Sequence, residues 1–86
     1  MPDELERLYD AHAPAVFAFL LNLTRAEATT RDLLQEVFLK LARRPELLTT
    51  ACDERTFLLR LAHNAAIDSF RRQSTRERNH EALGAE

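Results

Sequence analysis

Polar side chains suited to nucleic-acid contact recur at helical spacing in the second half of the sequence. On a helical wheel, at about 100° per residue, His63, Asn64 and Arg71 fall within roughly 80° of Arg60. Arginine offers a fork of donors that suits phosphate, and asparagine can both donate to and accept from a base edge. Phe57 borders this strip, and an aromatic ring beside arginines can stack on an unpaired base. The residue types of this strip therefore suit contact with phosphates and base edges.

The same strip has a simpler interpretation as a solvated helix face. Arg60 and Asn64 could pair with neighbours on the helix, and Arg71 and Arg72 could be ordinary charges that stabilise a helix C-terminus. Taken alone, the strip favours this simpler interpretation, because basic helix ends are common. Asp68 is predicted to be structural in either case, since a carboxylate facing DNA repels phosphate. It would orient one of the two arginines or pair with another helix.

A second helical pattern, over residues 32–41, has an apolar side chain in the middle of its polar side. The polar side carries Asp32, Gln35 and Glu36, with Leu39 centred among them. A leucine among carboxylates and an amide is a poor choice for a surface that meets only water, so this side is predicted to contact a partner. The apolar side, predicted to face the core, is formed by Leu34, Val37, Phe38 and Leu41.

The composition of the 86 residues favours one folded, helical domain. Apolar residues make up 45% and charged residues 30%, which is the balance of a folded protein rather than a disordered one. A single glycine and the absence of tryptophan argue against a sheet with tight turns. A chain of this length buries only about 60–65% of its unfolded surface, so its stability is predicted to be modest.

The net charge of −2 hides an uneven distribution. Residues 1–36 hold seven acidic residues against three arginines, a net of −4, whereas residues 55–78 hold six arginines against two acidic residues, a net of +4. Two surfaces for two different partners would explain this asymmetry. Attraction between two charged helices of one fold explains it equally well, and the charges alone leave both interpretations open.

Three long helical patterns account for most of the chain and predict an all-α fold, a compact bundle of three to four helices. The first pattern covers residues 2–23, and Pro14 is predicted to kink or split this helix. Thr24 and Glu27 have the spacing of a capping box, which would begin the second helix. Pro45 disfavours helical geometry in the residue before it, so the second helix should end there.

The rest of the chain is predicted to hold a loop, a third helix and a polar tail. Residues 45–54 would form the loop, with room for one helical turn, and Asp53 or Glu54 could cap the third helix. That helix should run to the end of the domain, which we place at residues 1–72. Residues 73–86 are polar and are predicted to be a frayed tail or the start of an interdomain linker.

No enzyme, metal site or cofactor is predicted from the sequence. His12, His63 and His80 lie far apart and have no ligand spacing with Cys52 or with acidic residues. No serine, cysteine or lysine stands in a recognisable catalytic setting. The single cysteine cannot form an internal disulfide, and no apolar run approaches the roughly 20 residues that cross a bilayer. Because the chain also starts with acidic residues rather than a signal peptide, we expect a cytoplasmic protein.

In its two longest motifs the sequence resembles region 2 of bacterial sigma factors, in particular the extracytoplasmic-function (group IV) type. The family pattern Asp-Leu-hydrophobic-Gln-Glu-hydrophobic-Phe-Leu-x-Leu is complete over residues 32–41. The pattern aromatic-Leu-hydrophobic-Arg-hydrophobic-Ala-x-Asn-x-Ala-hydrophobic-Asp-x-hydrophobic-Arg is matched over residues 57–71. The resemblance covers residues 5–72, and two extended motifs in the right order make it specific.

The resemblance implies a transcription initiation factor domain that docks on core RNA polymerase and recognises and melts the −10 promoter element. In the family, the second helix docks on the clamp helices of the largest polymerase subunit, through the positions held here by Asp32, Gln35 and Glu36. Leu39 lies on the same face, which would explain its place on the polar side. An anti-sigma factor could be a further partner, and no membrane partner is expected.

In the family, the third helix and the loop before it bind the −10 element, open the duplex and hold a flipped base of the non-template strand. This implies DNA contact for Arg60 and Asn64, the melting edge for Phe57, and the base pocket for residues 45–56. Flipping a base costs a few kcal/mol, which the loop pocket and stacking must offset. Two arginines at the end of the helix would hold backbone phosphates. The full predicted DNA-binding set is Arg55, Phe57, Arg60, His63, Asn64, Arg71 and Arg72.

The sequence departs from the family pattern at several points. Phe57 stands where the family usually has tryptophan, and Ala42, often tryptophan in the family, is expected to lose core volume. Arg31 places a positive charge beside a surface expected to be acidic. The second helical domain of these sigma factors, which reads the −35 element, is missing, so we expect a piece of a longer protein rather than a natural single-domain protein. The alternative function is a helical protein–protein adaptor or decoy with the same fold and no DNA-binding role.

Overall fold

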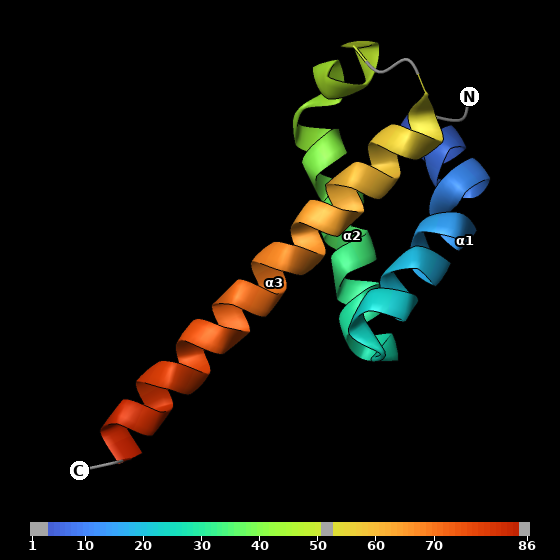
Figure 1. Cartoon of the computed structure of the whole chain (residues 1–86). Coiled ribbons are helices and arrows are strands. Elements are labelled where there is room, and N and C mark those ends of the chain that lie inside the picture. Colours follow the sequence, from blue (N-terminus) through green and yellow to red (C-terminus); the bar gives the residue numbers. More distant parts are fainter. Residues whose placement is uncertain (1–3, 51–52, 85–86) are drawn as a thin grey trace.

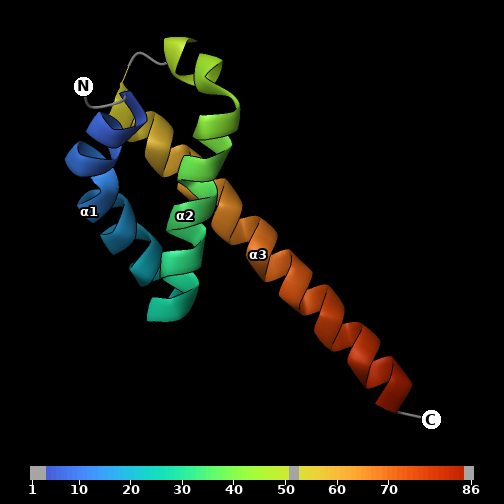
Figure 2. The same cartoon turned by 180° about the vertical axis from the view of Figure 1, so that it is seen from behind.

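Helices account for nearly all of the computed structural model, which describes residues 4–50 and 53–84 and the side chains of residues 4–48 and 53–77. The elements are α1 (Glu4–Thr24), α2 (Glu27–Arg43), the 3-10 helix η1 (Pro45–Thr50) and α3 (Glu54–Gly84). Helices α1 and α2 run antiparallel, and α3 packs across both before it projects beyond them (Figures 1 and 2). The predicted all-α bundle is confirmed. The projecting end of α3 gives the molecule its extents of 58 × 23 × 23 Å.

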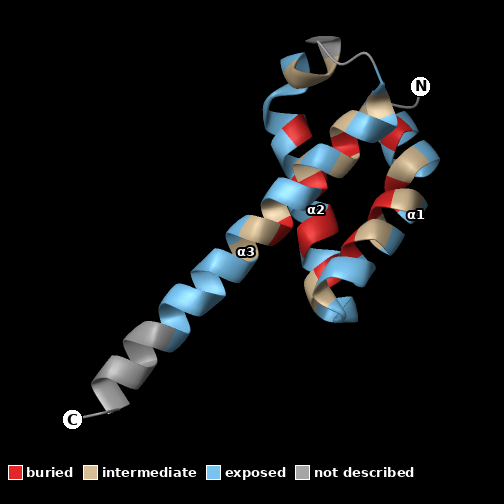
Figure 3. Ribbon diagram, viewed as in Figure 1, coloured by how far each residue is buried: buried red, intermediate tan, exposed pale blue. Residues whose placement is uncertain are grey.

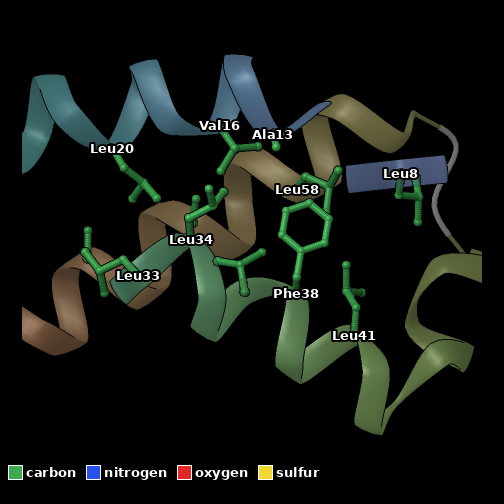
Figure 4. Close-up of a cluster of buried hydrophobic side chains, with 12 residues drawn as sticks. Leu8, Ala13, Val16, Leu20, Leu33, Leu34, Phe38, Leu41 and Leu58 are labelled. Atoms are coloured by element: carbon green, nitrogen blue, oxygen red, sulfur yellow. The ribbon is translucent and has the colours of Figure 1, made fainter. Parts of the chain in front are cut away.

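One hydrophobic core joins the three α-helices. Leu58, Ala62 and Ala66 recur every four residues along α3 and are fully buried, and the two alanines let α3 approach its neighbours closely. Phe38 extends from α2 toward Leu58 (Figure 4). The predicted apolar side of residues 32–41 is therefore confirmed as core. The buried residues of α1 and α2 are Leu8, Ala13, Val16, Leu20, Thr30, Leu33, Leu34, Val37, Phe38 and Leu41.

Pro14 does not split the first helix. Helix α1 is continuous from Glu4 to Thr24 with Pro14 inside it. The proline is exposed, and so is Asp10, whose carbonyl would otherwise accept a hydrogen bond from residue 14. Water can therefore satisfy that carbonyl, which makes the proline tolerable at this position.

The junction between α1 and α2 differs from the predicted capping box. Thr24 still belongs to α1, and the N-cap of α2 is Ala26, which makes no side-chain capping bond. Arg25 breaks the helix with a positive φ of 58°, a left-handed conformation that costs a non-glycine residue about 1–2 kcal/mol. The Thr24 hydroxyl accepts from the Ala26 amide at 3.2 Å and contacts the Thr30 hydroxyl at 2.7 Å. Threonine hydroxyls thus hold this turn together without a capping box.

Replacing the buried Thr30 with valine should lower stability by about 1 kcal/mol, because an isosteric methyl group cannot replace the bond between the two hydroxyls. Chemical denaturation measures this change. Thr29→Val is the matched control, since Thr29 precedes it on the same helix and is only half-buried. Equal losses in the two variants would contradict a specific role for the Thr24–Thr30 contact.

A side-chain cap begins α3, as the sequence predicted. Asp53 accepts from the Arg55 amide through Oδ1 at 3.2 Å and from the Thr56 hydroxyl through Oδ2 at 2.6 Å. The Thr56 hydroxyl, followed by the amides of the first turn, holds the pKa of the Asp53 carboxyl below its usual value. The helical turn expected between α2 and α3 is present as η1. The cap fixes the residue at which α3 starts.

Helix α3 is longer than predicted. It continues to Gly84, well past the expected end near Arg72, so the frayed tail predicted for this segment is wrong up to that glycine. Residues 73–83 contain no proline or glycine, and Gln73 donates to Glu77 at 3.2 Å across one turn. The polar composition of this segment indicates that it does not pack against the core. A helix surrounded by water is still compatible with that composition. The division between a domain of residues 1–72 and a linker stays a prediction.

Candidate functional site

The predicted polymerase-docking residues lie together on the outer side of α2. Asp32, Gln35, Glu36 and Leu39 are all exposed, and we refer to them as the α2 outer surface. Leu39 is 54% exposed, whereas the adjacent Phe38 is 6% exposed and belongs to the core. A large apolar side chain is therefore presented to solvent among acidic and amide groups.

Arg31, the positive charge beside this surface, has a partner on its own helix. Its guanidinium donates to Glu27 at 2.8 Å, one helical turn earlier. The pair is well exposed and worth little in stability. It nevertheless neutralises the positive charge next to Asp32, so the departure from the family pattern leaves the acidic surface intact.

The centre of the predicted DNA-binding set lies on the side of α3 opposite the core. Arg60, Asn64 and Arg71 are exposed, and we refer to them as the α3 outer surface. They are about half a turn away from the buried stripe that begins at Leu58. Figure 3 shows the buried segments of the three α-helices facing one another and the outer sides exposed.

The remaining predicted DNA-binding residues lie on other sides of α3. His63 is exposed, with its ring centroid 6.5 Å from that of Phe19 on α1. Phe57 is half-buried and packs against the core, so only part of its ring is available for stacking. Arg55 is exposed in the first turn of α3. Arg72 faces α2, where its guanidinium lies 3.9 Å from the Glu36 carboxylate.

A small groove between α2 and α3 connects the two predicted sets. It has a volume of about 140 Å³, and Glu36, Asn64 and Arg72 all line it. Because both partners of the Glu36–Arg72 pair are more than half exposed, the pair contributes at most about 1 kcal/mol. Asp68 lines the same groove beside Arg72, as expected if it orients an arginine. Its structural role stays a prediction.

Ala42 lines a pocket on the surface. The loss of core volume predicted for this position is therefore wrong. The residue is exposed at the last turn of α2, so a small side chain there leaves no cavity in the core. Instead it lines a pocket of about 440 Å³ between the start of α1, the end of α2 and η1. The other lining residues are Glu4, Leu5, Leu41, Pro45, Leu48 and Glu54.

The basic surface extends further along α3 than the sequence predicted. Thr75 and Arg76 line an open concavity of about 650 Å³ together with Arg71 and Arg72. The segment after residue 72 was expected to be frayed, so Arg76 was not placed beside the earlier arginines. The lack of helix-breaking residues before Gly84 was the available signal.

The described residues hold neither a metal-ligand cluster nor a membrane-spanning helix. No group of three or more histidine, cysteine, aspartate or glutamate residues in that part of the chain could hold a metal ion. None of the described helices is long and apolar enough to span a membrane. Cys52 lies outside the described residues, as does the side chain of His80.

The chain belongs to the family described as Sigma-70 region 2, whose model matches residues 8–76. The match includes both sequence motifs and the two outer surfaces defined above. No solved structure matches the chain significantly.

Several curated relatives are extracytoplasmic-function sigma factors. The chain is 33% identical over 75 residues to the ECF RNA polymerase sigma factor SigX of Bacillus subtilis, covering 87% of this chain and 39% of the relative. It is 37% identical over 76 residues to SigL of Mycobacterium tuberculosis, covering 87% and 42%. It is 37% identical over 71 residues to the RNA polymerase sigma factor CarQ of Myxococcus xanthus, covering 83% and 41%. The chain thus spans about two fifths of the length of these relatives.

Proposed function

We propose that this chain is the promoter-recognition domain of an extracytoplasmic-function sigma factor. It docks on core RNA polymerase through α2 and binds the −10 element through α3. The observation that carries the proposal is the presence of two distinct exposed surfaces on the two family motifs, one acidic around Leu39 and one basic around Arg60. Family membership supplies the partners that these two surfaces fit.

The α2 outer surface is the proposed polymerase contact. Asp32 and Glu36 would pair with cationic groups on the clamp helices of the largest subunit, and Gln35 would hydrogen-bond beside them. Leu39 would supply the apolar anchor at the centre. This arrangement of one desolvated apolar residue inside a polar rim is typical of a protein–protein contact.

The α3 outer surface and the η1–α3 loop are the proposed contact with the non-template strand. Arg60 and Asn64 would bind phosphate and a base edge, while Arg71 and Arg72 would hold phosphates. The exposed part of the Phe57 ring would support the melted edge by stacking. The proposed base pocket, residues 45–56, includes residues 51 and 52, which lie outside the described residues. The proposed DNA-binding set also keeps Arg55 and His63.

A protein–protein adaptor with the same fold is the second candidate. The net charge of −2 favours it, and so does the pairing of Arg72 with Glu36, which reduces the positive charge available to DNA. An anti-sigma factor is a proposed partner under either function, on family resemblance alone. We propose a cytoplasmic location, because core polymerase works there.

Salt dependence of strand binding separates the two candidates. With core polymerase present, fluorescence anisotropy of a labelled −10-type single strand should give log K falling linearly with log salt. The expected slope is about −1.4 to −2.8, since each of roughly two to four neutralised phosphates contributes about −0.7. A scrambled strand controls for sequence. A flat response would favour the adaptor.

A further inference from the structure

An ion-pair cluster ties the first residue of α3 to α1. Arg7 donates to Glu54 through Nη2 at 2.6 Å and through Nη1 at 3.5 Å, and it also bonds Glu4 on its own helix. His12, five residues further along α1, lies with Nε2 3.4 Å from the same Glu54 carboxylate. Glu54 therefore receives two donors from positions more than 40 residues earlier in the chain.

The histidine of this cluster depends on Glu54 for its orientation. Its side chain is only 13% exposed, and Nδ1 is buried with no hydrogen-bond partner. Because a carboxylate oxygen accepts and does not donate, Nε2–H is the donor to Glu54 in this contact. Of the two ring nitrogens, only Nε2 anchors the imidazole.

The carboxylate is held in its charged form. Donation from Arg7, and after it from His12, lowers the pKa of Glu54 below its usual value. Arg7 lowers the pKa of Glu4 in the same way. A lowered carboxyl pKa contributes stability above the unfolded pKa and loses it as pH falls through the folded value. At neutral pH the cluster is therefore fully ionised at both carboxylates.

The ion-pair cluster lies at the start of α3, just before the proposed DNA-binding residues in the sequence. Asp53 caps α3, Glu54 is its first helical residue, and Phe57 and Arg60 follow within two turns. The cap determines at which residue α3 starts, and the bonds from α1 determine where that start lies in space. Glu4 and Glu54 also line the 440 Å³ pocket beside η1, so the same contacts shape one wall of that pocket.

We propose that Arg7, Glu54 and His12 form a positioning clamp that holds the beginning of α3 in the geometry that accepts the −10 strand. The inference rests on the proposed function. Leu58, Ala62 and Ala66 already anchor the body of α3 in the core. Loss of the clamp thus displaces the first turn of α3, while α2 and its outer surface stay in place.

Glu54→Ala tests the clamp because the clamp and simple electrostatics predict opposite changes in affinity for the strand. Removal of a carboxylate near DNA, with no other effect, raises affinity for a polyanion. The clamp predicts the opposite, a loss of about five-fold in affinity for the −10 strand, with polymerase affinity unchanged. Glu6→Ala is the matched control, because it removes an exposed carboxylate of α1 that belongs to neither outer surface nor the clamp, and it should leave strand binding the same or slightly tighter.

A double-mutant cycle with Arg7→Ala tests whether Arg7 and Glu54 act through their mutual contact. If both residues act through one clamp, Arg7→Ala/Glu54→Ala should bind the strand about as well as Glu54→Ala alone. At saturating protein, the fluorescence of 2-aminopurine at the flipped position should be lower per bound strand, a change that a smaller folded fraction alone does not produce. Glu54→Gln keeps the side-chain length and should give an intermediate loss if Glu54→Ala folds poorly.

The outcomes separate the clamp from the proposed function. Strand binding by Glu54→Ala that equals or exceeds the parent's, with Arg60→Ala impaired, would overturn the clamp alone. Additive losses in the double variant would also overturn it. Parent-like strand binding by the Arg60 and Asn64 variants would instead overturn the proposed function, and the clamp with it.

Discussion

Leu39→Asp should reduce affinity for core polymerase by roughly 30-fold or more while leaving the domain folded. The fold tolerates the change because Leu39 is 54% exposed and lies outside the core, so its stability should shift by no more than about 0.5 kcal/mol. The interface does not tolerate it, because a desolvated apolar anchor is worth about 2 kcal/mol or more. The new carboxylate would also lie among Asp32 and Glu36, where a like charge is unfavourable.

The measurement is a titration of core polymerase with labelled variants, with circular dichroism to verify folding. Leu21→Asp is the matched control, since Leu21 is a partly exposed leucine on α1, away from α2's outer side. It should bind polymerase as the parent does. Affinity of Leu39→Asp within two-fold of the parent would remove the α2 outer surface from the docking proposal.

For a second variant in this titration, Asp32→Arg is a better choice than any substitution at Glu36. Glu36 pairs with Arg72 and lines the groove that Asn64 also lines. A substitution at Glu36 would therefore disturb both outer surfaces at once, and a loss of promoter binding could not be assigned to one of them. Asp32 is exposed on the same side of α2 and avoids this ambiguity.

The faces of the two motif helices could be predicted because they depend on local periodicity. Leu34, Val37 and Phe38 recur at three- and four-residue steps, and a core on one side requires that pattern whatever the partner helix is. The exposure of Leu39 follows from the same geometry. Arg60 and Asn64 were likewise placed by their angle from the apolar side of α3.

The features that the sequence did not predict depend on tertiary contacts or on competition between local signals. Nothing near Glu54 in the sequence shows that its partner is Arg7, because 47 residues separate them. At the α1–α2 junction, the sequence has the spacing of a capping box, but the chain forms a left-handed turn at Arg25 instead. The contact between the Thr24 and Thr30 hydroxyls stabilises that turn. In both cases the deciding partner becomes visible only once the helices are packed.

Arg60→Ala and Asn64→Ala should each weaken binding to the −10 strand, in ways that distinguish phosphate contact from base recognition. Both side chains are exposed on α3 and outside the core, so neither change should unfold the domain. If Arg60 holds a phosphate, its variant weakens all strands alike and makes the salt slope less negative by about 0.7. If Asn64 reads a base, its variant keeps the slope and loses roughly 1–3 kcal/mol of discrimination at one position.

Anisotropy titrations with matched and scrambled strands, repeated over several salt concentrations, measure both quantities. Arg25→Gln is the control for net charge, because it removes one positive charge at the α1–α2 junction, at the far end of α1 from the start of α3 (Figure 1). It should leave the discrimination between strands unchanged. Parent-like affinity, slope and discrimination in both the Arg60 and the Asn64 variants would mean that α3 does not read the strand. The basic strip would then be a solvated helix face, and the adaptor function would become the better account of this fold.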